Sequence, residues 1–367
     1  MSIFTIFLAT PPGLEHLLLA EASEKGFADC ALVAGGVEFQ GTWRDVWRAN
    51  LELRGASRIL ARVGSFRAMH LAQLDKRSRK FPWADILRPG VAVRVEATCK
   101  ASKIYHAKAA SQRVERALVE EMGITIASDA PVTLKVRIDD DLCTFSLDTT
   151  GEPLHKRGHK EAVGKAPMRE NLAALFLRDC GYDGREPVMD PMCGSGTFLI
   201  EAAEIALGLQ AGRSRAFAFE HLATFDPTAW AEMRKGSNEA ISEPMFFGSD
   251  RDAGAIKNSK ANAERAGVDH LTQFSCHAVS DLIRPDHASG LVIVNPPYGA
   301  RIGERKLLFS VYGALGKTLL ERFKGWRVGI ITSDPGLAKS TGLPFQGQPT
   351  QVSHGGLKIG LYKSARL

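Results

Sequence analysis

The sequence has few cysteines, and none of them forms a pair at metal-binding or disulfide spacing. No Cys-x-x-Cys occurs among the six cysteines, which lie at positions 30, 99, 143, 180, 193 and 276. This scattering argues against a zinc ribbon or a disulfide framework, and it favours a reducing, cytoplasmic compartment. No apolar run approaches the length of a membrane span. The apolar residues 2–10 have no basic leader, so we expect a first strand there rather than a signal peptide.

The sequence also lacks a convincing set of metal ligands. Of the ten histidines, His155 and His159 are spaced i, i+4, a spacing that suits metal ligands on a helix. They lie, however, in the basic stretch 155–160, which is typical of a solvated linker. We therefore expect no bound metal.

Net positive charge is absent from the first part of the chain and concentrated in the middle. The 367 residues carry a net charge of +6 and are enough for two or three domains. Residues 1–55 hold 4 basic and 7 acidic side chains, residues 56–165 hold 20 and 13, and residues 166–367 hold 23 and 21. The excess of basic residues in the middle segment suits the binding of a polyanion such as RNA. Basic side chains that only keep a surface solvated explain the excess about equally well.

The pattern of apolar residues divides the chain into four parts. We predict a ferredoxin-like module at 1–55, a small α+β domain at 56–150, a basic linker at 151–165 and a larger domain at 166–367. In the last part helices and strands alternate, which predicts a mainly parallel, doubly wound α/β sheet. Strand-like runs around Gly355 predict a closing antiparallel hairpin. Helices are expected at residues 14–25, 43–53, 107–122, 171–180, 196–207 and 253–266.

A glycine-containing loop follows the first strand of the last part. It reads Asp190-Pro191-Met192-Cys193-Gly194-Ser195-Gly196-Thr197, and a helix-like apolar stretch follows it. Gly194 and Gly196 remove side chains where the backbone turns tightly and approaches a ligand. Neither a third glycine nor Gly-Lys-Ser/Thr follows in this loop, which disfavours phosphate binding. The loop suits S-adenosylmethionine, and a purely structural turn is the alternative. No base is visible near Cys193, so we expect it to pack rather than to attack a substrate.

Asp250 ends the next predicted strand, 60 residues after Asp190. A carboxylate at this place can accept both ribose hydroxyls of an adenosine. The usual gap is nearer ~20 residues, and an irregular insert at about 208–243 accounts for the difference. The alternative is that Asp250 caps the helix that begins at Ala253.

The sequence Asn295-Pro296-Pro297-Tyr298 follows the apolar run 291–294. The ends of parallel strands are where open α/β sheets place ligands. An exocyclic amine is a poor nucleophile because its lone pair is delocalised, and two acceptors on its N–H bonds can direct that lone pair at a methyl donor. The Asn295 side chain and the Pro296 carbonyl suit this role, the two prolines stiffen the turn, and Tyr298 offers a ring for stacking. A rigid turn without chemistry is the alternative.

These motifs resemble those of the RNA methylases that join a THUMP domain to a class I methyltransferase domain. The resemblance extends over nearly the whole chain and rests on the stretches DPMCGSGTFLIE (190–201), NPPYG (295–299), KASKIYH (100–106), LDTTG with LHKRG (147–158) and APMRENLA (166–173). The nearest match is the guanine-N2 methyltransferase portion of bacterial 23S rRNA enzymes. Those enzymes often carry a second methyltransferase domain, which this sequence does not show.

The resemblance implies a Rossmann-like class I methyltransferase domain at 166–367, a THUMP-like RNA-binding domain at 56–150, and S-adenosylmethionine as cofactor. It assigns catalysis to Asn295, Pro296, Pro297 and Tyr298. Cofactor contacts are expected from Asp190, Pro191, Cys193, Gly194, Ser195, Gly196, Thr197, Asp250, Asp281 and Asn295. RNA contacts are expected from Lys100, Lys103, Tyr105, His106, Arg157 and Lys160. At one place the chain departs from the family: Ala278 stands where an acidic residue meets the cofactor's adenine, and Asp281 is the candidate substitute.

We interpret the chain as a cytoplasmic S-adenosylmethionine-dependent RNA methyltransferase that acts on the exocyclic N2 of a guanine, first of all in 23S rRNA. A guanine in tRNA and the N6 of adenine in DNA or RNA remain open, although no helix-turn-helix or finger for reading DNA is evident. Glutamine methylation of a protein is disfavoured by the basic middle part. An RNA-binding assembly factor without catalysis is the alternative of another class; Asn295 and Gly196 argue against it, and Ala278 favours it.

Overall fold

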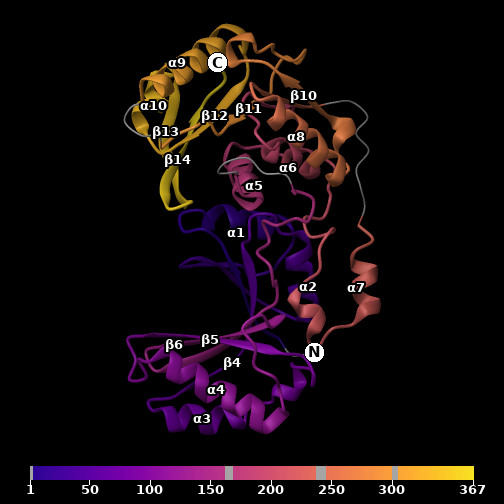
Figure 1. Cartoon of the computed structure of the whole chain (residues 1–367), viewed down its shortest axis with the longest axis vertical. Helices are drawn as coiled ribbons and strands as arrows, with labels where there is room; N and C mark the ends of the chain where they lie inside the picture. The colour runs from indigo at the N-terminus through magenta and orange to yellow at the C-terminus, as the bar shows by residue number, and fades with distance from the viewer. Residues whose placement is uncertain (1–2, 162–167, 237–244, 300–304) are drawn as a thin grey trace. The chain divides into compact units, whose positions relative to one another are not determined.

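The protein forms two compact units, each assembled from separate parts of the chain. The computed structural model describes residues 3–161, 168–236, 245–299 and 305–367. Unit 1 comprises Met1–Thr10, Leu18–Leu154 and Arg215–Lys235, and unit 2 comprises Pro11–Leu17, His155–Ser214 and Gly236–Leu367. Figure 1 follows the chain by colour from the indigo N-terminus to the yellow C-terminus. None of the helices among the described residues has the length and apolar character needed to cross a membrane.

Unit 1 is built on one seven-stranded sheet with the order β2-β3-β1-β4-β7-β6-β5. The strands are β1 Phe4–Ala9, β2 Ala31–Val33, β3 Gly36–Gly41, β4 Arg58–Arg67, β5 Val93–Lys100, β6 Val132–Asp139 and β7 Leu142–Asp148. All neighbours are antiparallel except β5 and β6. Because β4 pairs with β1 on one side and with β7 on the other, the parts predicted at 1–55 and 56–150 share a single sheet.

The helices of unit 1 begin and end at residues with a clear physical role. The α-helices before β6 are α1 Glu15–Glu24, which starts in unit 2, α2 Trp43–Glu52, α3 Leu71–Arg79 and α4 Ala107–Met122. At the start of α2 the Thr42 N–H donates to the Asp45 carboxylate at 2.8 Å, as in a capping box. Helix α4 ends at Gly123, whose φ of 65° is left-handed and suits glycine. Helices α3 and α4 pack against each other (Figure 1).

The segment Arg215–Lys235, predicted as part of the larger domain, belongs to unit 1 instead. It holds the short helices η2 Ala218–His221 and α7 Pro227–Met233. Its buried Phe217, Phe219 and Trp230 enter the same hydrophobic core as Trp47 of α2, whose ring centroid lies 6.0 Å from that of Phe219. Burial of these large rings explains the position of the segment, because aromatic side chains contribute strongly to a core.

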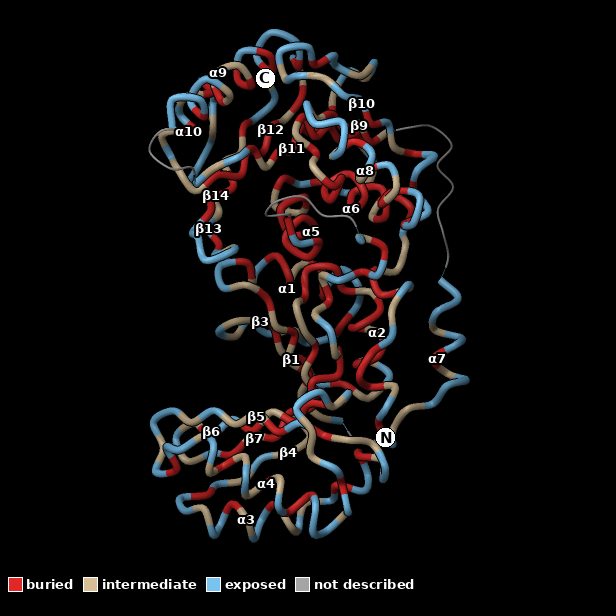
Figure 2. The backbone as a smooth tube through the Cα atoms, in the orientation of Figure 1, coloured by how far each residue is buried: buried red, intermediate tan, exposed pale blue. Residues whose placement is uncertain are grey.

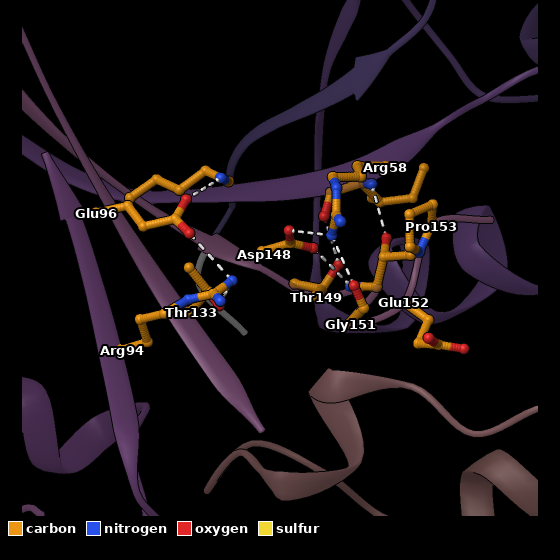
Figure 3. Close-up of polar contacts among 12 residues, drawn as sticks. Arg58, Arg94, Glu96, Thr133, Asp148, Thr149, Gly151, Glu152 and Pro153 are labelled. Carbon is orange, nitrogen blue, oxygen red and sulfur yellow. Dashed lines mark hydrogen bonds and ion pairs between the residues drawn. The ribbon is translucent and has the colours of Figure 1, made fainter. Parts of the chain in front are cut away.

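Two arginines of unit 1 hold the chain that leaves β7. Arg58 donates to the Asp148 carboxylate at 2.5 Å and to the Gly151 carbonyl at 2.6 Å, as Figure 3 shows. Arg215 donates to the carbonyls of Thr150 at 3.2 Å and Pro153 at 2.8 Å. The residues directly after β7 are therefore fixed to unit 1, and the chain enters unit 2 at His155.

Unit 2 contains a second seven-stranded sheet, with the order β10-β9-β8-β11-β12-β14-β13. The strands are β8 Val188–Asp190, β9 Phe246–Asp250, β10 Thr272–Cys276, β11 Leu291–Val294, β12 Arg327–Thr332, β13 Phe345–His354 and β14 Leu357–Ser364. Strands β8 to β12 are mutually parallel, and β14 pairs antiparallel with β12 and with β13. The predicted doubly wound sheet with its closing hairpin is confirmed.

Helices cover both faces of this sheet. They are α5 Glu170–Asp179, α6 Thr197–Ala206, α8 Ala253–Ala266, α9 Arg305–Arg322 and α10 Pro335–Ser340. In β11, Leu291 and Ile293 pack with α5, α6 and α8, whereas Val292 and Val294 pack with α9. Successive side chains of a strand point to opposite faces, so a strand buried on both faces is apolar throughout. Figure 2 shows the burial of β11, α5 and α6 in red.

Candidate functional site

Three neighbouring strands of unit 2 end in polar residues on one edge of the sheet. Strand β8 ends at Asp190, β9 ends at Asp250, and Asn295 directly follows β11. Because β9, β8 and β11 are adjacent and parallel, their carboxyl ends lie side by side. The chain order reverses between β8 and β11, and such a switch point is the usual ligand crevice of an open α/β sheet.

The loop after β8 makes a tight, glycine-dependent turn into α6. Gly194 and Gly196 have φ of 54° and 80°, in the left-handed region. A Cβ on Gly196 would lie 3.3 Å from the Ser259 Cβ and 3.4 Å from the Phe274 ring, so a side chain there would be both strained and crowded. A Cβ on Gly194 would meet nothing within 4 Å. Gly194 therefore leaves open space where the backbone of the loop faces outward.

Helix α8 holds the glycine loop in place through two hydrogen bonds. The Ser259 hydroxyl donates to the Gly194 carbonyl at 2.8 Å, and the Asn262 amide donates to the Ser195 carbonyl at 3.1 Å. Neither residue was predicted as part of the site, because their spacing in the sequence matches no known motif. The available signal was that two polar residues lie on the inner face of an amphipathic helix. Cys193 is buried beside Ser259, with 3.7 Å between the sulfur and the hydroxyl oxygen. Burial raises the pKa of the Cys193 thiol, which fits packing rather than nucleophilic attack.

The Asp190 side chain is buried and carries an unusual charge state. Burial, opposed by the hydrogen bond from the Met192 N–H at 3.1 Å, raises the pKa of Asp190 to about 8. Asp250 raises it further through like charge. At neutral pH the carboxyl is therefore mostly protonated, and a cation placed next to it would favour its ionised form. The hydroxyls of Ser195 and Thr197 lie 3.4 Å apart at the end of the same loop.

Asp250 connects the second strand to the loop. Its Oδ2 accepts the Gly194 N–H at 3.1 Å, and its Oδ1 accepts the Asp252 N–H at 3.0 Å. The alternative that Asp250 caps α8 is wrong: Asp252 caps this helix by accepting the Gly254 N–H at 2.7 Å. Asp250 is thus left at the edge of the sheet, beside the loop, with acceptor capacity beyond the two backbone bonds.

Asn295 presents a buried oxygen that lacks a partner. Its Oδ1 is inaccessible to solvent and accepts no hydrogen bond from any residue that the structure describes. Buried acceptors normally have a partner, so an unsatisfied one next to an open loop points to a ligand. Pro296 is buried and Pro297 is exposed. Tyr298 is half-buried, packs against the hydrophobic clusters on both sides of the sheet, and has a hydroxyl whose pKa burial raises.

The segment after β10 carries the departure from the family. The His277 N–H donates to the Asp250 carbonyl at 3.1 Å, which places this segment beside Asp250. Ala278 precedes the short helix η4, Val279–Asp281, and Asp281 is exposed at its end. Asp281 thus follows shortly after the backbone hydrogen bond that joins this segment to Asp250.

The basic stretch 155–160 is bound to unit 2 rather than solvated, and this corrects the prediction. Arg157 and Glu201 of α6 form an ion pair at 3.1 Å, with each side chain 1% exposed. His159 is buried, and its Nε2 lies 3.6 Å from Glu204 Oε1. Lys160 lies 3.1 Å from Glu170 and donates to the Met168 carbonyl at 2.8 Å. The charges of Arg157 and Lys160 are thus paired inside the unit, which disfavours contact of these two residues with RNA. A sign of this was available: α6 places acidic residues in an otherwise apolar helix.

The other predicted RNA-contacting residues are exposed between β5 and α4. Lys100, Lys103, Tyr105 and His106 all face solvent, and Tyr105 is 73% exposed. The rings of Tyr105 and His106 lie 4.2 Å apart, so they form a small aromatic surface. The Lys103 ammonium lies 3.6 Å from the sulfur of Met69, an exposed residue that the sequence reading missed. The stretch 166–173, which carries part of the family resemblance, overlaps the start of α5, and its residues 166 and 167 lie outside the described residues.

Comparison with solved structures finds the same architecture along the whole chain. A protein from Listeria monocytogenes, described as a predicted N6-adenine-specific DNA methylase, is 28% identical over 100% of this chain and 97% of its own, with a TM-score of 0.88. SMU.472, named as a methyltransferase and crystallised with S-adenosylhomocysteine, is 27% identical over 100% and 99%, with a TM-score of 0.87. TrmN from Thermus thermophilus shares the fold, at 20% identity over 100% of both chains and a TM-score of 0.76.

Two family models match the sequence itself. The RlmL ferredoxin-like domain matches residues 5–60, and the methyltransferase domain described as RMKL-like matches residues 157–355, more than half of the chain. The described residues fit S-adenosylmethionine: the open space at Gly194, the carboxylate of Asp250 and the buried Asp190 line one sheet edge. The fold is that of a Rossmann-like class I methyltransferase with an N-terminal α+β region. The chain belongs to the RMKL-like methyltransferase family, and S-adenosylmethionine is its cofactor.

Proposed function

We propose that the protein transfers a methyl group from S-adenosylmethionine to the exocyclic N2 of a guanine in RNA, with 23S rRNA as the first candidate. The observation that carries the proposal is the buried oxygen of Asn295, just after β11, which accepts no hydrogen bond from the residues that the structure describes. It lies on the sheet edge that also holds the glycine loop and Asp250. A hydrogen-bond acceptor that is inaccessible to solvent at this position suits an N–H group of a planar amine.

In this proposal the residues act by placement. The Asn295 Oδ1 and the Pro296 carbonyl accept the two N–H bonds of the amine, so that its lone pair points along the transfer direction. The sulfonium of the cofactor supplies the methyl group when it is bound. Asn295 and Pro296 would hold the amine nitrogen while it takes the methyl group, and one amine proton would leave to solvent. Tyr298 stacks on the base, and Pro297 stiffens the turn.

The cofactor would lie along residues 190–197 and against Asp250. We assign Asp250 to the ribose hydroxyls and Asp281 to the adenine, in place of the acidic residue absent at Ala278. Asp190 would meet the positively charged methionine part. The cofactor would also contact the backbone of Cys193, Gly194 and Ser195 and the side chain of Thr197. Pro191 would shape the start of the turn.

RNA is the favoured substrate because of the first unit. Lys100, Lys103, Tyr105 and His106 combine positive charge with exposed rings, the combination typical of single-stranded nucleic-acid sites. We retain residues 56–150 as a THUMP-like module and 1–55 as a ferredoxin-like module. The target base must leave its stack to reach Asn295, so an unpaired or extruded guanine is expected.

Adenine-N6 is the second candidate, and the Listeria relative favours it by its description as an adenine-specific DNA methylase. The two bases are separated by product analysis. Unmodified 23S rRNA, tRNA and a DNA duplex are each incubated with the protein and S-adenosylmethionine, and their nucleosides are identified by mass spectrometry. N2-methylguanosine in the rRNA supports the proposal, N6-methyladenine supports the second candidate, and N2-methylguanosine confined to tRNA moves the substrate there. No transfer to any of them favours a non-catalytic RNA-binding factor.

A further inference from the structure

Helix α9 carries an exposed aromatic side chain close to its start. Leu308, Tyr312, Leu315 and Leu319 bury one face of the helix against the sheet. Phe309 lies outside this face and its side chain is 36% exposed, whereas most large hydrophobic residues of unit 2 are buried. An exposed leucine needs no explanation, but an exposed phenylalanine beside a substrate edge is a candidate contact residue.

The Phe309 ring is held in place by charged and backbone neighbours. The guanidinium carbon of Arg305 lies 5.8 Å from the ring centroid, within cation–π range. Arg305 is in turn bound by Asp334, with 3.3 Å between Nη2 and Oδ2. A Cβ on Gly336, at the start of α10, would lie 3.6 Å from the tip of the ring. The ring therefore rests against α10, next to an exposed positive charge.

This pair lies on the same edge of the sheet as Asn295. Strands β11 and β12 are parallel neighbours with Val294 opposite Ile330, so the residues after Thr332 come to the same edge as those after Val294. Asp334 and Gly336, which hold Arg305 and Phe309, belong to that segment. On α9 itself, Tyr312 is one turn beyond Phe309 and lies in the hydrophobic cluster against which Tyr298 packs. Phe309 thus lies one helical turn from the cluster against which Tyr298 packs.

We infer that Phe309 and Arg305 form a platform on which the nucleotide next to the target base stacks. The inference rests on the proposed function and deepens it, since an extruded base leaves its neighbour unstacked. An exposed ring with an adjacent guanidinium is what single-stranded RNA requires: the ring takes the base, and the charge takes the phosphate. The occupant is a single-stranded nucleotide rather than a protein segment, because the ring suits a base and the Arg305 guanidinium, 65% exposed beside its partner Asp334, has further donors for a phosphate.

The test compares variants of the full chain in steady-state methylation of an unmodified 23S rRNA transcript. Phe309→Ala should raise KM about tenfold, the equivalent of one lost stacked base, and leave kcat within about threefold. Phe309→Trp should keep the wild-type KM, because tryptophan also stacks. Arg305→Lys should raise KM as well, because lysine keeps the charge without the planar group. Leu320→Ala, which removes another exposed side chain of α9, is the matched control and should change nothing.

The outcomes separate the platform from the proposed function. Titration of each variant with S-adenosylhomocysteine should give the wild-type Kd. A Phe309→Ala protein with unchanged KM would refute the platform while leaving the methyltransferase proposal in place. A loss in kcat and in cofactor affinity together would assign Phe309 a structural role and likewise refute it. A wild-type protein that neither binds nor methylates the transcript would overturn the proposed function, and the platform with it.

Discussion

Replacement of Asp250 by alanine is expected to weaken S-adenosylmethionine binding severely. In the structure the carboxylate accepts the Gly194 N–H at 3.1 Å and the Asp252 N–H at 3.0 Å, and it lies at the sheet edge where a ribose would meet it. A hydrogen bond to a charged group contributes about 1.5–3 kcal/mol. Loss of two such bonds to the ribose therefore predicts a Kd roughly 10²- to 10⁴-fold higher.

Two further variants separate the role of the charge from that of the acceptor. Asp250→Asn keeps an oxygen for the Gly194 N–H but removes the charge, so we expect a Kd between those of the wild type and the alanine variant. Asp269→Ala removes an exposed negative charge from the same unit and should leave the Kd unchanged. Isothermal titration calorimetry measures all three, and circular dichroism checks that they fold. A Kd for Asp250→Ala within about threefold of the wild type would show that Asp250 serves only the backbone.

Four other outcomes are expected. Asn295→Ala should lower the rate of methyl transfer by roughly 100-fold or more while cofactor binding stays intact, and Tyr298→Ala should reduce it more than Tyr298→Phe; equal rates in a methylation assay would contradict both roles. Lys100→Ala with Lys103→Ala should weaken RNA binding and flatten its salt dependence, which titrations at several salt concentrations measure against Lys235→Ala, a variant of an exposed lysine of the same unit. Arg157→Met should destabilise the protein by about 3–5 kcal/mol because it breaks a buried ion pair by removing one member. Arg157→Met with Glu201→Leu should recover most of that loss. Denaturant unfolding measures both, and a harmless single variant would show that the pair is not buried in solution. Burial raises the pKa of Asp190 to about 8, so the folded protein favours the protonated form, and the contribution of Asp190 to stability falls as the pH rises from about 4 to 8. Cofactor affinity should rise over pH 6 to 8 with release of a proton. Binding of the wild type that does not depend on pH, or the same pH dependence in Asp190→Asn, would contradict this assignment.

The site was predictable where local sequence decides the geometry. The left-handed glycines 194 and 196, the strand 291–294 and the position of Asn295 after it follow from turn chemistry and strand periodicity, and the structure places them as expected. Helix 253–266 was also correctly bounded, because Asp252 and Gly267 supply its cap and its stop.

What failed depends on contacts between distant residues. The ion pair that accompanies the burial of Arg157 is made with Glu201, which is far away in the sequence. A basic stretch that is exposed in a linker and one that is buried in an ion pair therefore have the same local sequence pattern. The pairing of β4 with both β1 and β7 is equally non-local. The segment Arg215–Lys235 is polar enough to read as an insert, and only its spaced rings at Phe217, Phe219 and Trp230 hint at a core elsewhere.

The interleaving of the two units has an evolutionary consequence. Residues Pro11–Leu17 contribute Leu14 and Leu17 to the core of unit 2, and Arg215–Lys235 contributes aromatic rings to that of unit 1. A gene fusion that joins either unit to a new partner at one junction would strip hydrophobic residues from both cores. Neither unit can therefore be exchanged between enzymes as a cassette, and divergence on this architecture is expected to proceed by point substitutions rather than by domain shuffling.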